Sequence, residues 1–323
     1  MLAIQATRTG GPEVLEAVDL PVPTPDAGQI LIRHEAIGLN FIDTYQRSGL
    51  YPVPMPCVLG LEGAGVVEAI GEGVTRFAAG DRVAYANGPP GAYAEYHCVP
   101  EGRVVRIPEG VDSQTAAAAM LKGMTAEFLL RRCYPVKQGD AVLIHAAAGG
   151  VGSILTQWAK ALGATVIATV GSADKAGLAR ANGANEVILY RDEDVAARVT
   201  AITGGGGVRV VYDGVGAATF EASLNSLGRR GMLVSYGNAS GPAPAIAPLR
   251  LSRGGSLFLT RPTLFDYVAT TQELDESAGA LFEVIRSGAV KIAIGQTFPL
   301  ARARQAHEAL EARETTGSTL LIP

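Results

Sequence analysis

The sequence predicts an α/β protein with two domains, one of them built around a doubly wound parallel sheet. The chain has 323 residues, which is more than a single small core usually covers. Its first 120 or so residues contain short β-branched runs separated by Gly, Pro and Asp, which is typical of a β-rich domain. From about residue 123, apolar strand-like runs alternate with helix-like runs, as parallel βαβ units require.

The β-rich part is expected to cover residues 1–122. Its strand-like runs include QILIRHEAIGLN at 29–40, GAGVVEAIG at 63–71 and DRVAYA at 81–86. Two groups of closely spaced prolines interrupt the segments between these runs, and they exclude long helices there. The prolines are Pro21, Pro23, Pro25, Pro52, Pro54 and Pro56.

The alternating part is expected to cover residues 123–263. Its apolar runs carry apolar residues on both faces, as expected for strands covered by helices on both sides. The predicted strands are 141–148, 164–171, 186–190, 208–216 and 232–238, and the predicted helices are 153–163, 172–183 and 195–204. The run FEASLNSLGRRG at 220–231 precedes the last of these strands. The run GGGG at 204–207 is expected to be a flexible loop. From about 264 the pattern changes again, to one helix and short strands that end the chain.

Composition excludes several functional classes. The net charge is −4, from 27 Lys and Arg against 31 Asp and Glu, which does not favour nucleic acid or an anionic membrane as a partner. The three cysteines are far apart and odd in number, which favours a reducing cytosol over a disulfide framework. We find neither a signal peptide pattern nor an apolar run of 18 residues.

The stretch HAAAGGVG, at 145–152, lies between the first predicted strand of the alternating part and its first helix. Small residues here let the backbone approach a dinucleotide pyrophosphate, and the helix N-terminus stabilises its charge. Ala148, Gly149, Gly150 and Gly152 stand where G-x-G-x-x-G is expected, so the spacing departs from the usual one. The alternative is a tight turn that binds no ligand.

The end of the second strand predicts NADPH over NADH. NAD-binding proteins usually carry Asp or Glu at this position, on the ribose 2′-hydroxyl. Here Gly171 and Ser172 occupy it, and Lys175 is close enough to meet a 2′-phosphate. Asp174 argues the other way, but an acid in the first turn of the following helix also suits the helix dipole.

Taken together, these stretches resemble the zinc-independent quinone oxidoreductases of the medium-chain dehydrogenase/reductase superfamily, the group that includes zeta-crystallin. The likeness extends over AIGLNFIDTYQRSGLYP at 36–52, LGLEGAGVVEAIGEGV at 59–74, HAAAGGVG, VVYDGVG and SYGNASG. It implies a GroES-like catalytic domain at 1–122, completed by 264–323, and a Rossmann domain at 123–263, with NADPH in the cleft between them. It also implies a cytoplasmic homodimer or tetramer, with GSLFLTRP at 255–262 near the dimer interface.

The resemblance also implies the site residues. Asn40 and Tyr45 are the catalytic candidates beside the nicotinamide, and the Tyr45 hydroxyl either donates a proton to a quinone oxygen or only closes the pocket. Thr125, taken to open the helix of LKGMTAEF, is placed near the nicotinamide phosphate. Arg313 is either a cofactor contact or a solvated helix charge. The other cofactor contacts are Ala148, Gly149, Gly150, Val151 and Gly171, then Lys175 and Tyr190 at the 2′-phosphate, Tyr236, Gly237 and Asn238 beside the ribose, and Phe258, Leu259 and Thr260 near the carboxamide.

No metal is expected. Zinc-dependent members of the superfamily carry a His where this chain has Leu61, and Asn40 stands near the position of their Cys ligand, so three ligands are not available. We expect Glu62 and Asp43 to be structural hydrogen-bonding carboxylates. His145 is also expected to be structural, while the remaining histidines, His34, His97 and His307, show no partner spacing.

The predicted function is therefore NADPH-dependent reduction of a small quinone without a metal. One alternative is NADPH-dependent reduction of the C=C bond of an enal or enone. Another belongs to a different class, a structural or RNA-binding crystallin-like protein. The net charge and the lack of a basic cluster interleaved with aromatic residues argue against RNA.

Overall fold

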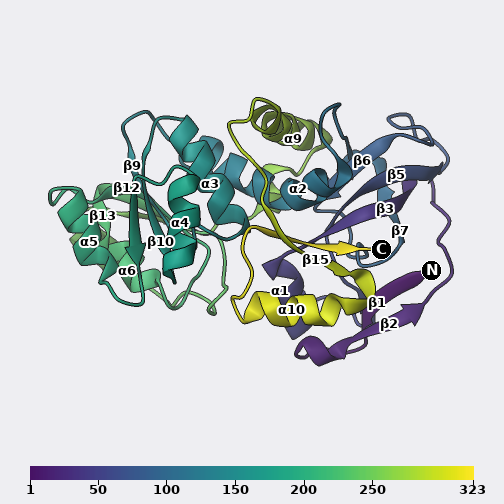
Figure 1. Ribbon diagram of the computed structural model, residues 1–323, viewed down its shortest axis with the longest axis horizontal. Coiled ribbons are helices and arrows are strands. Elements are labelled where there is room, and N and C mark those ends of the chain that lie inside the picture. The colour runs from purple at the N-terminus through teal and green to yellow at the C-terminus, as the bar shows by residue number, and fades with distance from the viewer. The chain divides into compact units, whose positions relative to one another are not determined.

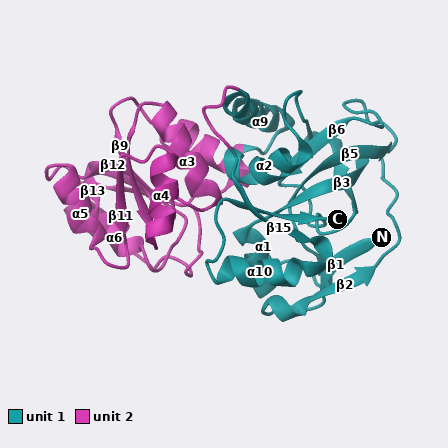
Figure 2. Cartoon of the chain, viewed as in Figure 1, with its two compact units in different colours: residues 1–124, 268–286, 292–323 teal, residues 125–267, 287–291 magenta.

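The computed structural model describes all residues, 1–323, as two compact units (Figures 1 and 2). Unit 1 comprises Met1–Met124, Val268–Arg286 and Ile292–Pro323, and unit 2 comprises Thr125–Tyr267 and Ser287–Lys291. Residues 287–291, which the sequence assigns to the first domain, thus belong to unit 2. Gln157 holds them there, because its side chain bonds both the N–H and the carbonyl of Lys291, at 2.8 and 3.0 Å.

Unit 1 is β-rich. It contains a three-stranded sheet of order β2-β1-β4 and a seven-stranded sheet of order β15-β16-β3-β5-β6-β8, with β7 paired to β3. The strands are β1 (Leu2–Ala6), β2 (Leu15–Asp19), β3 (Gln29–Leu39), β4 (Cys57–Val58), β5 (Glu62–Ile70), β6 (Arg82–Ala86), β7 (Tyr96–Pro100), β8 (Val105–Arg106), β15 (Ile294–Pro299) and β16 (Ser318–Ile322). The C-terminal strand β16 pairs antiparallel with β3, so the chain's tail completes the sheet that its N-terminal part begins.

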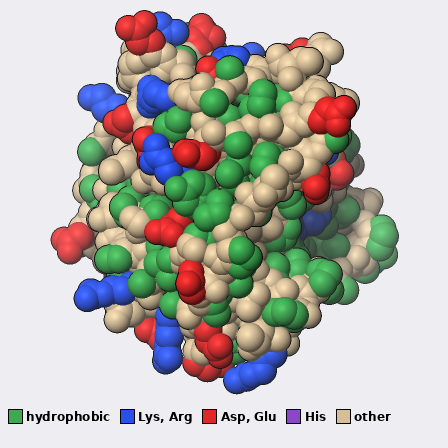
Figure 3. All heavy atoms as spheres, turned by 90° about the vertical axis from the view of Figure 1, so that its right-hand side faces the viewer, with side chains coloured by type: hydrophobic (Ala, Val, Ile, Leu, Met, Phe, Trp, Pro, Cys, Tyr) green, Lys and Arg blue, Asp and Glu red, His purple; other side chains and the backbone are tan.

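Short helices and turns connect the strands of unit 1. They are α1 (Phe41–Ser48), α9 (Thr271–Arg286), α10 (Ala303–Glu311), the 3-10 turns η1 (Pro12–Val14), η2 (Glu101–Arg103) and η4 (Leu300–Arg302), and most of α2 (Ser113–Phe128). Alternating side chains of the strands fill the core. In β3, Ile30, Ile32 and Ile37 are fully buried. On the face of unit 1 seen in Figure 3, acidic, basic and apolar side chains are interspersed.

Unit 2 contains a parallel six-stranded sheet of order β11-β10-β9-β12-β13-β14. The strands are β9 (Ala141–Ile144), β10 (Thr165–Val170), β11 (Glu186–Leu189), β12 (Val208–Asp213), β13 (Leu227–Ser235) and β14 (Phe258–Thr260). The order runs outward from β9 in one direction and from β12 in the other. The sheet is therefore doubly wound, as predicted, and its topological switch point lies between β9 and β12.

Helices connect the parallel strands (Figure 1). They are α3 (Gly150–Ala161), α4 (Ala173–Ala181), α5 (Val195–Ile202), α6 (Phe220–Asn225), α7 (Pro248–Arg253) and α8 (Leu264–Tyr267), with a π-helical turn η3 (Leu129–Cys133) after α2. Helices α5 and α6 contribute Val199 and Phe220 to the buried cluster that includes Leu143 of β9. No helix is long and apolar enough to cross a membrane.

The loop before β12 lies against the start of β13. Helix α6 ends at Asn225, and strand β13 begins at Leu227. The run 204–207 belongs to a loop, as predicted, with positive φ at Gly204, Gly205 and Gly207. The two backbones come into close contact. A Cβ on Gly228 would lie 2.3 Å from the carbonyl oxygen of Gly206.

Candidate active site

The glycine turn lies at the carboxyl end of β9, beside the switch point of the sheet in unit 2. Helix α3 begins at Gly150, and its N-cap residue is Gly149. A Cβ at Gly152 would lie 2.2 Å from the carbonyl oxygen of Ala146, so only glycine permits this approach of helix to strand. The result is a partly buried helix N-terminus without bulky side chains, a geometry that suits a pyrophosphate.

The end of β10 carries no carboxylate. Gly171 follows the strand, and a Cβ there would lie 2.6 Å from the hydroxyl oxygen of Tyr190, which follows β11. Ser172 is the N-cap of α4, and its hydroxyl accepts a hydrogen bond from the N–H of Lys175 at 3.4 Å. The structure thus brings together Gly171 and Tyr190, and it places Lys175 in the first turn of the adjoining helix.

The loops after β12 and β13 lie against each other. A Cβ at Gly214 would lie 2.8 Å from the Tyr236 ring, and one at Gly237 would lie 2.4 Å from the Gly214 carbonyl oxygen. The Asp213 carboxylate accepts hydrogen bonds from backbone and hydroxyl groups of the first loop and fixes it. Residues 236–238 therefore lie at the carboxyl edge of the sheet, where parallel sheets bind ligands.

The remaining predicted cofactor contacts of unit 2 lie on two elements. Phe258, Leu259 and Thr260 form the edge strand β14 beside β13, with Thr260 opposite Val234. Thr125 does not open a helix, which corrects the prediction. It lies in the last part of α2, because the alanine-rich run 116–119 already continues the helix upstream to Ser113. Thr125 is buried, with 8% of its surface exposed.

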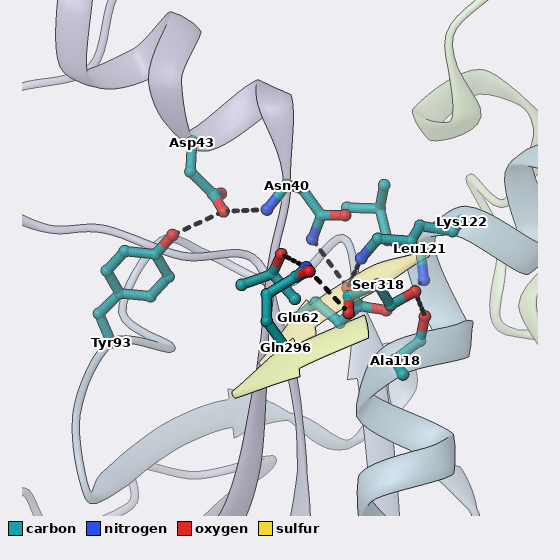
Figure 4. Close-up of polar contacts among 10 residues, drawn as sticks. Asn40, Asp43, Glu62, Tyr93, Ala118, Leu121, Lys122, Gln296 and Ser318 are labelled. Atoms are coloured by element: carbon teal, nitrogen blue, oxygen red, sulfur yellow. Dashed lines mark hydrogen bonds and ion pairs between the residues drawn. The ribbon is translucent and has the colours of Figure 1, made fainter. Parts of the chain in front are cut away.

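In unit 1, Asn40 and Glu62 belong to one buried polar cluster (Figure 4). The side-chain amide of Asn40 donates to Glu62 Oε2 at 2.7 Å, and Lys122 Nζ lies 3.3 Å from the same oxygen. The backbone N–H of Leu121 donates to Glu62 Oε1 at 2.7 Å. The carboxylate has no exposed surface, so the prediction that Glu62 is a structural, hydrogen-bonded group is confirmed.

Asp43 also has a structural position, as predicted. It lies in the first turn of α1, and its Oδ2 accepts from the backbone N–H of Asn40 at 2.8 Å and from the Tyr93 hydroxyl at 2.9 Å. These two bonds close the N-terminus of the helix that carries Tyr45. Burial of the carboxyl raises the pKa of Asp43 to about 7, against the opposing effect of its two hydrogen bonds.

Tyr45 lies on α1 and is almost fully buried, with 9% of its surface exposed. Its ring meets the Tyr51 ring edge-on, with centroids 5.2 Å apart, and lies 6.3 Å from the Phe41 ring. Arg313 occupies the turn after α10, with a φ of +61°, and its side chain is exposed. The structure thus places Asn40 and Tyr45 on the same short helix and its cap, while Arg313 lies on a separate turn of unit 1.

Known proteins with similar sequences cover this chain completely. It is 53% identical over 321 residues to "Quinone oxidoreductase" of Pseudomonas aeruginosa, spanning 99% of both chains. The chain belongs to the quinone oxidoreductase family. It is a member of the medium-chain dehydrogenase/reductase superfamily. Two family models match it, "Alcohol dehydrogenase GroES-like domain" at residues 26–109 and "Zinc-binding dehydrogenase" at 150–282.

Two further relatives bear on function. A crystal structure of Escherichia coli quinone oxidoreductase in complex with NADPH is 48% identical, has a TM-score of 0.98, and covers 100% of both chains. The "2-haloacrylate reductase" of a Burkholderia species is 43% identical over 331 residues, which is 100% of this chain and 99% of that protein. Relatives of this chain are thus named for the oxidoreduction of quinones and for the reduction of 2-haloacrylate.

The zinc in the name of one family model does not fit the residues of this oxidoreductase. Leu61, at the expected ligand position, is apolar and 2% exposed. The Asn40 amide is committed to Glu62, whose two oxygens already accept from three donors. No group of three or more His, Cys, Asp or Glu side chains is placed to hold a metal ion.

The histidines show what sequence reasoning missed. His145 is structural, as predicted, since its ring nitrogens lie 2.9 Å from the hydroxyls of Thr169 and Ser223. His34 and His97, which show no partner spacing in the sequence, both lie 2.9 Å from the Tyr85 hydroxyl. His307 also has hydrogen-bond partners, Tyr93 and Arg47.

Burial explains the charge state of these histidines. It lowers the pKa of His34 to about 4 and that of His97 to about 3. His307 Nε2 lies 2.9 Å from the Tyr93 hydroxyl, and its Nδ1 accepts from Arg47 at 3.0 Å. Burial and the neighbouring Arg47 lower its pKa to about 3. All three rings are therefore neutral at pH 7, and no local spacing links them to their partners, Tyr85, Tyr93 and Arg47.

Proposed function

We propose that this oxidoreductase transfers a hydride, or electrons, from NADPH to a small quinone without a metal ion. The observation that carries the proposal is the full-length likeness to relatives named for quinone reduction, one of them solved with NADPH. The end of β10 supports the choice of cofactor. Gly171 and Ser172 stand where NAD-binding proteins place an acid, so no carboxylate there repels a 2′-phosphate.

When bound, NADPH supplies the hydride, and the residues of the chain bind and orient it. The N-terminus of α3, with Ala148, Gly149, Gly150 and Val151, is proposed to hold the pyrophosphate. Lys175 and Tyr190 are proposed to meet the 2′-phosphate beside Gly171. The further proposed contacts are Thr125 near the nicotinamide phosphate, Tyr236, Gly237 and Asn238 beside the ribose, Phe258, Leu259 and Thr260 near the carboxamide, and Arg313.

Tyr45 is proposed to complete the reduction by donating a proton. Hydride transfer to one end of a quinone leaves charge on an oxygen, and a hydroxyl within reach of that oxygen can deliver the missing proton. The edge-on contact with Tyr51 holds the Tyr45 ring in place. Asn40, at the N-cap of the same helix, is proposed to orient the nicotinamide.

A second candidate function is reduction of the C=C bond of an enal or enone. The Burkholderia relative named 2-haloacrylate reductase favours it. Such a reaction needs a proton on carbon, whereas the oxygen of a reduced quinone also takes protons readily from water. Tyr45→Phe should therefore slow enone turnover while leaving quinone turnover nearly unchanged if C=C reduction is the native reaction. Equal slowing with both acceptors would show that Tyr45 serves both reactions alike, and it would argue against this second candidate.

Cofactor choice is tested by equilibrium titration of NADPH and NADH, followed by protein fluorescence, with wild type, Lys175→Ala and Lys137→Ala. Lys137 is an exposed control that precedes β9, at the opposite edge of the sheet. We expect tighter binding of NADPH than NADH, and loss of that preference only in Lys175→Ala. Equal affinities in wild type would contradict the proposed cofactor.

We further propose a homodimer in the cytoplasm. The outer edge of β14 has no partner strand in the chain, and Phe258 on it is 55% exposed. A second copy pairing at this edge would cover both features. The three cysteines are free thiols, which is consistent with a reducing compartment. RNA is not favoured as a partner, because the net charge is −4, and on the face seen in Figure 3 charges of both signs are interspersed.

A further inference from the structure

Glu62 is held in a site built for a carboxylate. Gly38 of β3 lies opposite Glu62 of β5 in the sheet register. A Cβ on Gly38 would lie 2.1 Å from Glu62 Oε2 and 2.5 Å from the Ala117 carbonyl oxygen. The glycine therefore leaves the space that the carboxylate fills, between the sheet and α2. A side chain fixed this closely can in turn fix the group that it binds.

The donors around Glu62 determine its chemical role. The Asn40 amide, the Leu121 N–H and the Lys122 ammonium all donate to it, at 2.7, 2.7 and 3.3 Å. Each of these groups donates its hydrogen bond to Glu62, so the glutamate acts only as a hydrogen-bond acceptor. The Asn40 carboxamide must then turn its NH2 group toward Glu62. Its carbonyl oxygen necessarily faces the other way (Figure 4).

We propose that Glu62 is a positioning residue that orients the Asn40 carboxamide, so that Oδ1 of Asn40 accepts a hydrogen bond from the nicotinamide half of NADPH. The inference rests on the proposed function. An oxidised quinone has only acceptor oxygens and cannot provide this bond. The nicotinamide half has two kinds of donor, the carboxamide N–H and the ribose O–H. Either of these groups can donate the hydrogen bond that Asn40 Oδ1 accepts.

The test is Glu62→Gln, which keeps the shape of the side chain but can also donate. A glutamine lets the Asn40 amide turn over, so its oxygen is no longer held toward the cofactor. Binding is measured by fluorescence titration with NADPH and with its 3-acetylpyridine analogue, which replaces the carboxamide NH2 by a methyl group. We expect NADPH to bind about 3- to 10-fold more weakly to Glu62→Gln, the size of one hydrogen bond.

The analogue separates the two donors. If the carboxamide is the donor, Glu62→Gln weakens NADPH but not the analogue, and the preference of wild type for NADPH disappears. If a ribose hydroxyl is the donor, both cofactors weaken by the same factor. The matched control is Glu127→Gln in unit 2, where another buried carboxylate bonds Arg132 at 2.8 Å.

Unchanged binding in Glu62→Gln, or the same change in Glu127→Gln, would overturn the inference while leaving the proposed function intact. If wild type binds neither cofactor, the proposed function itself fails and the inference fails with it.

A second variant covers the case in which Glu62→Gln does not fold. In Asn40→Asp, the new carboxyl faces the Glu62 carboxylate, which also pairs with Lys122. The Asp43 carboxylate lies close by, on the backbone N–H of residue 40. It can bond Glu62 only while protonated, and it then still presents a carbonyl oxygen to the cofactor. NADPH should therefore bind this variant well at low pH and progressively more weakly as the pH rises. Binding that is independent of pH between 5 and 8, with wild type as reference, would contradict the inference.

Discussion

At the scale of single residues, the ion pair of Lys122 and Glu62 makes the strongest stability prediction. Both side chains are almost fully buried, with 7% and 0% exposed. Replacing Lys122 by Met leaves the Glu62 carboxylate in the interior without its cation, and this should lower the free energy of unfolding by about 3–5 kcal/mol. Urea denaturation measures the change. The exposed Lys137→Met should change it by less than about 0.5 kcal/mol, and similar losses in both variants would contradict this account of the pair.

Asp43 predicts a pH dependence with a definite sign. Its pKa is about 7 in the folded protein, because of burial, against 3.8 for an ordinary Asp. Between pH 4 and 7 the unfolded chain ionises this group while the folded protein keeps its proton. The stability that the group contributes is therefore complete below about pH 4 and is lost as the pH rises through 7.

Asp43→Asn removes this loss. The free energy of unfolding of wild type, measured by urea denaturation, should fall relative to that of Asp43→Asn between pH 4 and 7, by up to about 1.4 kcal/mol per pH unit. The neutral buried histidines have the opposite dependence, but both proteins share them, so the difference isolates Asp43. Parallel curves for the two proteins would show that Asp43 is ionised throughout this range.

Individual residues were predictable where the sequence alone restricts their role. Leu61 cannot bind zinc whatever surrounds it, and Glu62 beside it needs buried donors, which the structure supplies. The pairing of His34 and His97 through Tyr85 was not predictable. The three residues lie on β3, β7 and β6, and only the register of the sheet brings the two rings to one hydroxyl.

At the scale of elements, two helical glycines form a matched test of the turn before α3. Gly152→Ala would place a Cβ 2.2 Å from the Ala146 carbonyl oxygen, so it should displace the N-terminus of α3 and weaken NADPH binding at least tenfold. Gly177 on α4 has open space around it. Gly177→Ala should leave binding unchanged and stabilise the fold by about 0.5–1 kcal/mol. Titration and thermal unfolding of both variants check this, and tight binding by Gly152→Ala would refute it.

The alternation of strands and helices was predictable because buried parallel strands are apolar on both faces. Contacts between separate segments of the chain were not predictable in this way. Gly228 at the start of β13 meets Gly206 in the loop before β12, which no local pattern indicates. Thr125 was assigned to the wrong end of α2, because the helix begins at Ser113, twelve positions before it, within a segment read as part of the β-rich domain.

At the scale of the whole molecule, the exposed edge of β14 predicts the oligomeric state. A charge on this edge should prevent a second copy from pairing, so Phe258→Glu should be monomeric while wild type is dimeric. Leu178→Glu is the control, an exposed apolar residue on α4, which packs at the far side of the sheet. Analytical ultracentrifugation distinguishes these cases, and a dimeric Phe258→Glu would move the interface elsewhere.

The two-unit architecture was predictable from the length of the chain and from the change near residue 123, where strand-like runs begin to alternate with helix-like runs. The family resemblance predicted that the C-terminal tail completes the first unit. Local pattern alone could not show that β16 pairs with β3, since about 280 residues separate them. The residues of the candidate site were also predictable only in part from local pattern. Asn40 and Tyr45 come from the family motif, whereas Lys122 becomes part of the cluster only when α2 packs on the sheet.

The account as a whole is tested most directly by the oxidation of NADPH, followed by its absorbance, with 1,4-benzoquinone as acceptor and EDTA present throughout. We predict turnover with NADPH that exceeds turnover with NADH, that the chelator does not change, and that exceeds turnover with a simple enone. Turnover of the enone alone would transfer the assignment to C=C reduction. Loss of activity with EDTA, or no oxidation of NADPH by either acceptor, would contradict the metal-free quinone reductase.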